Sequence, residues 1–438
     1  MIVNDISLNR FITYTNSVYD IEEKFKGLTR NNYDYKSKPS TVAKTMFASF
    51  LCGYKSINVL NEVNKNKKLD LRMLYRKREY IPRTHGIRDC ITDTDCHQIE
   101  QINKSIILKA KENKVFRKNT IDGLCVMAWD GVELNETNKD ISGLPEREHS
   151  DGNISKYLKY LVGMNVGERA NIVVTSTQLL GTEKITTKSG NERAKTIGET
   201  KAFENVWKDT EKLIGRVIDV HVFDALFLNQ NVTSLIDKTG KYFVIRLKNE
   251  NRDIYKDAEG IFNKREADKE YEIVEIITTK DIKYSSNAKK KDEMKTKTKK
   301  EKRKISLAKL GEKVLVDEYV QNKKNSTVKV KVYEKVVTNM LNHDVETILK
   351  IMHLRWNIEN CGFRTLKQRY NINHIYIGNL NAINYIVQMI FLVFNLLELY
   401  TKFRLKIDMD ITWITIFKLF ERELHSDKKL IELFNSSG

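Results

Sequence analysis

The order of strand-like and helix-like segments between residues 121 and 248 constrains the fold of this chain most. Short apolar runs with β-type alternation, separated by turn residues, occupy 122–131, 157–166 and 170–181. A segment with helical periodicity follows at 198–215, and two more strand-like runs lie at 216–225 and 241–248. Three strands, a helix and two further strands predict an α/β domain built on a mixed sheet.

The segment before this domain has a helical pattern. Residues 41–63 and 95–114 carry apolar side chains at intervals of three and four. Between them, 69–83 interleaves cations with Tyr75 and Tyr80, a mixture that suits backbone phosphates with some stacking. A solvated helix with its tyrosines on the core side explains the same pattern equally well. We expect a helical, DNA-binding N-terminal domain over residues 1–118.

Residues 249–345 have a different character. Strand patterns at 271–280, 312–320 and 326–337 surround a lysine-rich tract at 283–304. We interpret them as a β-rich insertion with a basic loop, which is more often solvated than functional. The insertion follows the first part of the core, 119–248. A core helix region at 346–380 and a helical C-terminal region at 381–438 complete the predicted organisation.

The charge balance favours a polyanionic partner. The chain has 76 Lys and Arg against 58 Asp and Glu, a formal charge of +18. Such a surplus is typical of nucleic-acid binding, although a lysine-rich composition bias produces the same balance. Five irregularly spaced cysteines argue against a disulfide framework and favour the cytoplasm.

Nothing in the sequence indicates a membrane protein. The N-terminus lacks an apolar signal core. The longest apolar run, 385–400, contains Gln388, Asn395 and Glu398 and is shorter than the roughly 20 residues of a bilayer span. We therefore expect this run to form a buried core helix.

Two aspartates stand at the ends of predicted strands. Asp130 lies between Trp129 and Gly131, and Asp224 follows the apolar run 217–223. By alternation Asp219 points to the opposite face from Asp224. A single aspartate at a strand end is usually a turn or cap residue. Two of them on adjacent buried strands could instead contribute to a metal site.

A carboxylate among cations, amides and aromatic side chains marks residues 353–371, HLRWNIENCGFRTLKQRYN. On a helix Arg355 and Glu359 lie one turn apart on one face. Glu359, laid across the strands of Asp130 and Asp224, would complete a carboxylate set for two Mg²⁺ or Mn²⁺ ions.

These segments resemble the DDE class of cut-and-paste insertion-sequence transposases, in the group with a Tyr-Arg-Glu-Lys signature. The matching pieces are DG at 130–131, DALFLN at 224–229 and RWNIENCGFRTLKQRYN at 355–371. The resemblance implies a ribonuclease-H-like mixed sheet interrupted by a β-rich insertion and flanked by helical regions. It also implies that Asp130, Asp224 and Glu359 bind the metal ions. These ions would be Mg²⁺, for which Mn²⁺ could substitute.

The resemblance further implies the DNA contacts. Arg355 would contact DNA near the scissile phosphate. Lys367 stands one residue later than the signature lysine, which on an ideal helix would turn it to another face. A single-turn bulge at Gly362 could absorb the extra residue. Met352 replaces the signature tyrosine, so no phosphate contact is assigned to it.

Three further DNA contacts are predicted from the residues themselves. Trp356 could stack on a displaced base, although packing is the more common role. Arg246 and Lys248 point towards DNA if their strand borders the site.

The function implied is transposition. The chain would bind terminal inverted repeats, cleave element ends by metal-dependent hydrolysis and join the 3′ ends to target DNA, as a homodimer in the synaptic complex. Its expected partner is double-stranded DNA, and its expected localisation is cytoplasmic, in association with the nucleoid. Two alternatives are a structure-selective or repair nuclease on the same core and an inactive DNA-binding protein derived from a transposase.

Overall fold

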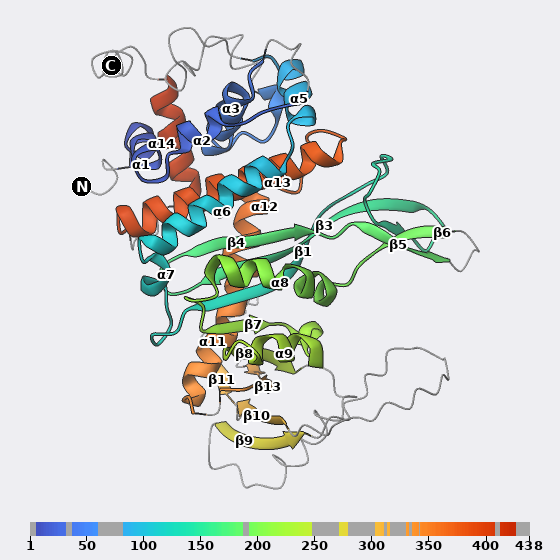
Figure 1. Ribbon diagram of the computed structural model, residues 1–438, viewed down its shortest axis with the longest axis vertical. Coiled ribbons are helices and arrows are strands. Elements are labelled where there is room, and N and C mark those ends of the chain that lie inside the picture. The colour runs from blue at the N-terminus through green and yellow to red at the C-terminus, as the bar shows by residue number, and fades with distance from the viewer. Residues whose placement is uncertain are drawn as a thin grey trace, which may run out of the picture. The chain divides into compact units, whose positions relative to one another are not determined.

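The computed structural model describes residues 6–31, 37–59, 82–186, 192–247, 271–278, 303–310, 313–315, 330–332, 335–340, 342–407 and 412–425. The helices and strands of this part of the chain are labelled in Figure 1. The chain divides into two compact units. Unit 1 comprises residues 1–120, 130–217 and 357–438, and unit 2 comprises residues 121–129 and 218–356. The domain boundaries expected from the sequence stay predictions.

Unit 1 begins with helices, as predicted. They are α1 (Leu8–Tyr19), α2 (Ile21–Lys26), α3 (Pro39–Leu51), α5 (Thr84–Asp93), α6 (His97–Glu112) and α7 (Val115–Lys118). The helix predicted at 95–114 is α6. The helix predicted at 41–63 ends as α3 at Leu51. Gly53 follows with φ 68°, and a Cβ there would lie 2.6 Å from the Phe417 ring, so the chain turns tightly beneath that ring. Residues 60–81, which include most of 69–83, lie outside the described part.

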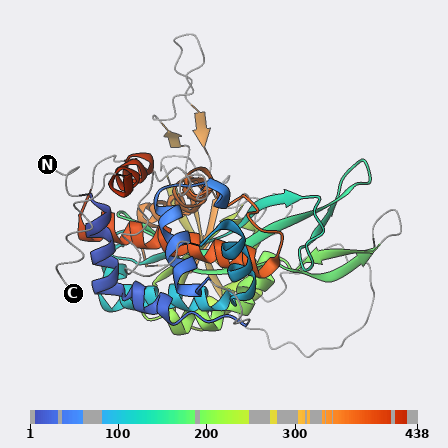
Figure 2. The same cartoon turned by 90° about the horizontal axis from the view of Figure 1, so that it is seen from above.

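The core of unit 1 forms around α13 (Leu380–Glu398), which continues into a π-helical turn, η5 (Leu399–Arg404). It packs against α3, α5 and α6, and Figure 2 shows its orange ribbon among the blue N-terminal helices. Within the described residues, 380–404 is long and apolar enough to cross a membrane, but 83% of its most apolar window is buried inside the structure. The prediction of a buried core helix for 385–400 is confirmed.

The polar residues of this apolar helix bind the edge of a β-strand. The strand is β4 (Asn171–Gln178), whose only partner among the described strands is β3 (Ile154–Val166). Val173 donates its N–H to Oδ1 of Asn395 (2.8 Å), and Nδ2 of Asn395 donates to the Val173 carbonyl (2.7 Å). Asn171 donates its N–H to Oε2 of Glu398 (3.3 Å). These contacts replace the strand-to-strand hydrogen bonds that an edge otherwise lacks.

The other strands of unit 1 surround β3. β3 pairs antiparallel with β2 (Glu146–Glu148) and with β4, and it neighbours β1 (Val126–Thr137). β5 (Gly181–Thr186) and β6 (Glu192–Thr196) form a separate hairpin. The amphipathic helix α8 (Glu199–Ile214) buries Phe203 and Trp207. Two C-terminal helices, α12 (Arg364–Arg369) and α14 (Trp413–His425), complete the unit.

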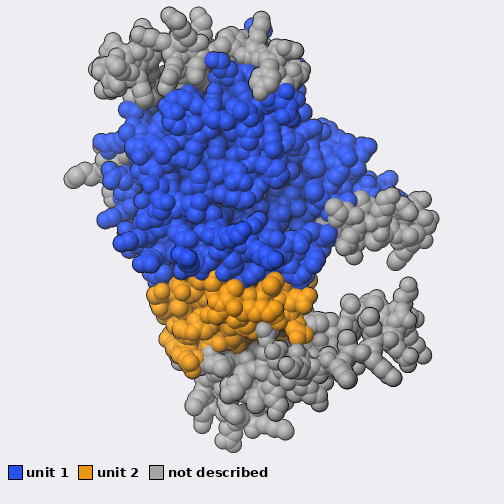
Figure 3. Space-filling model, viewed as in Figure 1, with its two compact units in different colours: residues 1–120, 130–217, 357–438 blue, residues 121–129, 218–356 orange. Residues whose placement is uncertain are grey.

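Unit 2, orange in Figure 3, is built on a mixed sheet. The first residues of β1 pair in parallel with β7 (Val220–Phe223), and β7 pairs in parallel with β8 (Tyr242–Leu247). β13 (Lys335–Thr338), β10 (Arg303–Leu310) and β9 (Tyr271–Thr278) extend the sheet in antiparallel fashion. Its described residues include the helices α9 (Gln230–Asp237) and α11 (Val345–Asn357). The predicted α/β class with a mixed sheet and helical flanks is confirmed.

The described strands of 249–345 include those expected from the sequence. β9, β11 (Lys313–Leu315) and β12 (Val330–Val332) fall within the three predicted segments, and β13 begins in the third and ends one residue beyond it. β10 was not predicted, because it begins at Arg303 inside the tract that we assigned to a basic loop. Ile305 and Leu307 alternate with other residues in this segment. The segment forms a strand that pairs with β9 on one side and β13 on the other. Residues 283–302 of the tract lie outside the described part.

Candidate active site

β1 and β7 are neighbouring parallel strands, and a predicted metal-binding aspartate directly follows the last paired residue of each. Their register ends with Trp129 opposite Phe223, and both side chains are fully buried. Asp130 follows Trp129, and Asp224 follows Phe223. The prediction of a strand end is confirmed for Asp224, which follows β7, and is wrong for Asp130, because β1 continues through Gly131 to Thr137.

Both aspartate carboxylates are oriented by a backbone amide. Oδ1 of Asp130 accepts a hydrogen bond from the Gly131 N–H (2.9 Å). Oδ1 of Asp224 accepts one from the Leu226 N–H (2.9 Å) and caps a short 3₁₀ turn, η3 (Ala225–Phe227). Both residues are partly exposed. A carboxylate offers about four acceptor positions, so an oxygen that accepts a backbone amide can also contribute to binding a cation.

Asp219 has a structural role. Its Oδ2 accepts the Cys125 N–H at 2.8 Å, which ties the chain before β7 to the start of β1. Asp219 therefore serves the backbone at the end of the strand pair opposite to Asp224.

A buried hydrogen bond joins the same two strands just before the aspartates. The indole Nε1–H of Trp129 donates to Nδ1 of His221 at 3.0 Å, and both side chains have no exposed surface. Burial lowers the pKa of His221 well below its usual value, and Lys241 lowers it further. The ring is therefore neutral, as an acceptor at Nδ1 requires. The sequence pattern indicated a packed or outward-facing histidine; the structure shows a packed, strand-joining one.

The helix that carries Glu359 contains the expected bulge. α11 is followed by a π-helical turn, η4 (Ile358–Phe363), before α12 begins. The Arg364 N–H donates to the Glu359 carbonyl, a span of five residues in place of four. Gly362 lies inside the turn, where a Cβ would come within 2.7 Å of Cε of Met164 in β3. The turn inserts one residue into the helix, which compensates for the late position of Lys367.

The side chains before Glu359 are mostly buried. Arg355 is 5% exposed and Met352 is 1% exposed. Trp356 is partly exposed, and its ring lies edge-on to His353 with centroids 5.2 Å apart. The structure therefore gives Met352 a core position, in agreement with the absence of a predicted phosphate contact.

The other predicted DNA contacts lie apart along the chain. Lys367 is partly exposed in α12, and Arg246 is partly exposed in β8. Lys248 lies outside the described residues. Glu359 itself is exposed on the π-helical turn.

A further carboxylate lies against the residue next to Asp130. An ideal Cβ on Gly131 would be 2.1 Å from Oε1 of Glu199, the first residue of α8. The same oxygen lies 2.7 Å from Nζ of Lys159 in β3. By their place on the helix before Asp224, Glu199 and Glu204 could both approach the predicted metal ions, although solvated helix faces explain them equally well. In the structure Glu204 pairs with Lys201 on its own helix (3.0 Å).

Within the described residues, no group of three or more histidine, cysteine, aspartate or glutamate side chains is arranged to hold a metal ion. Neither His85, Cys90, Cys96 and His97, which loosely resemble a metal-ligand set, nor the predicted triad of Asp130, Asp224 and Glu359 forms such a group in this part of the chain. Asp130 and Glu359 belong to unit 1 and Asp224 to unit 2.

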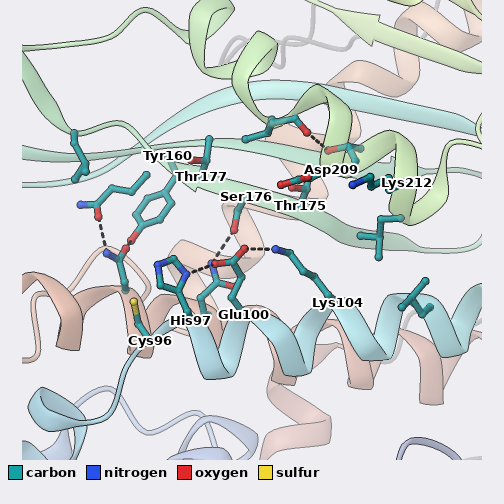
Figure 4. A pocket seen from close by; sticks show the side chains of 18 residues that line it. Cys96, His97, Glu100, Lys104, Tyr160, Thr175, Ser176, Thr177, Asp209 and Lys212 are labelled. Carbon is teal, nitrogen blue, oxygen red and sulfur yellow. Dashed lines mark hydrogen bonds and ion pairs between the residues drawn. The ribbon is translucent and has the colours of Figure 1, made fainter. Parts of the chain in front are cut away.

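A hollow of about 630 Å³ opens elsewhere in unit 1, between α6, α8, β4 and the start of α13 (Figure 4). His97 and Lys104 both pair with Glu100 along its α6 wall, at 2.9 and 2.7 Å. Thr175 and Thr177 of β4 line another wall. Neither Asp130 nor Glu359 lines it, so this hollow is separate from the predicted chemistry.

Residues 193–396 match the family model described as the transposase DDE domain. Asp224 and Glu359 fall inside the matched segment, and Asp130 precedes it. Among curated proteins, none matches this sequence. DDE transposases are metal-dependent enzymes that act on DNA, and their cores are ribonuclease-H-like. The family match and the mixed sheet with helical flanks together support a DDE-type transposase.

Proposed function

We propose that this protein is a cut-and-paste DNA transposase. It binds the terminal inverted repeats of a mobile element, cleaves the element ends and joins the 3′ ends to target DNA. The observation that carries the proposal is the parallel pairing of β1 with β7, whose next residues are Asp130 and Asp224. Residues in register on neighbouring strands share a face of the sheet, so continuation of this register would bring the two carboxylates to one face.

The donor set of the proposed site suits Mg²⁺ or Mn²⁺. Asp130, Asp224 and Glu359 offer carboxylate oxygens, the ligands that these ions prefer. Asp130 and Asp224 are partly exposed, and Glu359 is exposed. When bound, such ions activate an attacking oxygen and stabilise the leaving one. The role of the three carboxylates is to hold and space the ions.

The proposed DNA contacts surround Glu359 in sequence. Arg355 precedes it by one turn, and Lys367 follows the π-helical turn. Trp356 offers a partly exposed ring for stacking, while Arg246 and Lys248 extend the basic surface along β8. The protein acts on DNA at the nucleoid in the cytoplasm. Cleavage of two ends in one complex requires at least two copies of the chain.

The test is cleavage of a labelled duplex that carries the element end. Asp130→Ala, Asp224→Ala and Glu359→Ala should each abolish Mg²⁺-dependent cleavage, because each removes a metal-holding carboxylate, while binding to the same duplex stays within about twofold. Asp209→Ala is the matched control, since Asp209 is an exposed acid that lines the hollow instead. A residue whose replacement leaves cleavage at the level of the Asp209 variant does not belong to the site.

A nuclease on the same core would give the same cleavage result. Strand transfer separates the two, because a pre-cleaved element end should be joined to a target plasmid by a transposase and by no pure nuclease. Binding without cleavage or joining, under conditions in which the chain is folded, would identify an inactive derivative.

A further inference from the structure

The carboxylate of Glu199 occupies the space that a side chain at position 131 would fill. A Cβ on Gly131 would lie 2.1 Å from Oε1 and 2.6 Å from Oε2 of Glu199, far inside van der Waals contact. A side chain at position 131 would therefore require the Glu199 carboxylate to move. The residue that makes room is the direct neighbour of Asp130.

Glu199 is fixed in this place by three elements. Its side chain is only 10% exposed, and Nζ of Lys159 in β3 lies 2.7 Å from Oε1. Glu199 is also the first residue of α8, a helix of 16 residues, and a carboxylate at a helix N-terminus interacts favourably with the helix dipole. The charge is thus paired, mostly buried and held between β1, β3 and α8.

The contact acts on the backbone that orients Asp130. Successive residues of a strand face opposite sides of the sheet, so Glu199 packs on the side of β1 away from the Asp130 side chain. The Gly131 N–H donates to Oδ1 of Asp130 at 2.9 Å. Because Glu199 packs against the opposite side of the Gly131 backbone, the Gly131 N–H keeps one orientation. The Asp130 carboxylate that accepts from this N–H is then oriented as well.

We propose that Glu199, held by Lys159, is a positioning residue that orients Asp130 for metal binding. The inference rests on the proposed function, in which Asp130 holds a metal ion. It distinguishes Glu199 from Glu204, five residues further along the same helix, which forms an exposed pair with Lys201. Glu204 therefore provides the matched control.

The experiment measures Mn²⁺ binding by titration calorimetry on the full chain, and the Mg²⁺ concentration that gives half-maximal cleavage. Glu199→Gln and Lys159→Met should each weaken both about tenfold, the usual effect of removing a group that orients a metal ligand. Cleavage at saturating Mg²⁺ should change less, because the ligands themselves remain. Glu204→Gln should match the wild type.

Lys159→Arg separates a positioning role from a purely structural one. It keeps the ion pair and should retain wild-type Mn²⁺ affinity, whereas Lys159→Met should not. Equal Mn²⁺ affinities for the two Lys159 variants, or a wild-type affinity for Glu199→Gln, would overturn the inference. Normal binding and cleavage in Asp130→Ala would instead refute the proposed site, so the two failures are distinguishable.

Discussion

At the scale of single residues, the buried carboxyl of Glu398 stands out. Burial raises its pKa to about 7 from the usual 4.5, although the Asn171 N–H and Lys402 act in the opposite direction. Only 5% of the surface of Glu398 is exposed. Glu398 is therefore protonated in the folded protein over a pH range in which the unfolded chain would ionise it.

This raised pKa predicts a pH-dependent stability. The contribution of Glu398 to folding stability is fully present below its pKa in the unfolded chain, near 4.5. It is lost as the pH rises through the pKa of Glu398 in the folded protein, about 7. Between pH 5 and 8 the free energy of unfolding should fall by about 3 kcal/mol through this group. Glu398→Gln should remove that part of the slope, which urea denaturation at several pH values measures.

The control is Glu204→Gln, a partly exposed carboxylate paired with Lys201, whose loss should leave the slope unchanged. Identical slopes for the wild type and Glu398→Gln would show that Glu398 ionises normally in the folded chain.

Residue types and spacing predicted the aspartates but not the partners that decide each residue's role. Glu199 and Glu204 look alike in sequence, and only the packing of α8 on Gly131 separates them. Arg355 was expected at a DNA surface, yet its side chain is 5% exposed. Both outcomes depend on tertiary contacts that local periodicity does not contain.

At the scale of elements, the π-helical turn depends on a residue without a side chain. Gly362→Ala would place a Cβ 2.7 Å from Cε and 2.9 Å from Sδ of Met164. We expect a loss of about 1 to 3 kcal/mol in stability, because an added methyl forces a close-packed neighbour to move. Cleavage should fall as well, since Glu359 belongs to the same turn.

Thermal unfolding and DNA cleavage measure the two effects. Gly378→Ala is the control, because a Cβ at Gly378 meets nothing within 4 Å. Gly362→Ala should cost less stability in a Met164→Ala background than in the wild type, because the side chain that the added methyl would meet is gone. Equal melting temperatures for the Gly362 and Gly378 variants would show that the approach to Met164 is not required.

Element order was predictable where the hydrophobic period was clear, as in β1, β3, β4, α8, β7 and β8. The bulge at Gly362 was also predictable, because the late lysine demanded an extra residue in the helix. β10 was not, because its alternation starts within a lysine-rich tract and becomes a strand only between β9 and β13. After α3 ends at Leu51, Gly53 lies close to the Phe417 ring, which is distant in sequence.

At the scale of the whole molecule, the charge of +18 predicts salt-sensitive DNA binding. Each phosphate neutralised by a lysine or arginine releases counterions, so the logarithm of affinity should fall linearly with the logarithm of salt concentration. If about six to ten phosphates are contacted, affinity should drop roughly 10³-fold or more between 50 and 200 mM salt. Fluorescence anisotropy with an element-end duplex measures the slope.

A duplex of unrelated sequence should bind more weakly with a similar slope, because phosphate contacts carry no sequence information. A flat salt dependence for both duplexes would contradict the proposed basic surface.

The covered edge of β4 limits how copies of this protein can associate. Over Asn171 and Val173 the outward-facing backbone groups are already bound by side chains of α13. An incoming strand would have to displace Asn395 and the buried Glu398 before it could pair there. A second copy of this chain therefore does not extend the sheet by pairing a strand along this stretch.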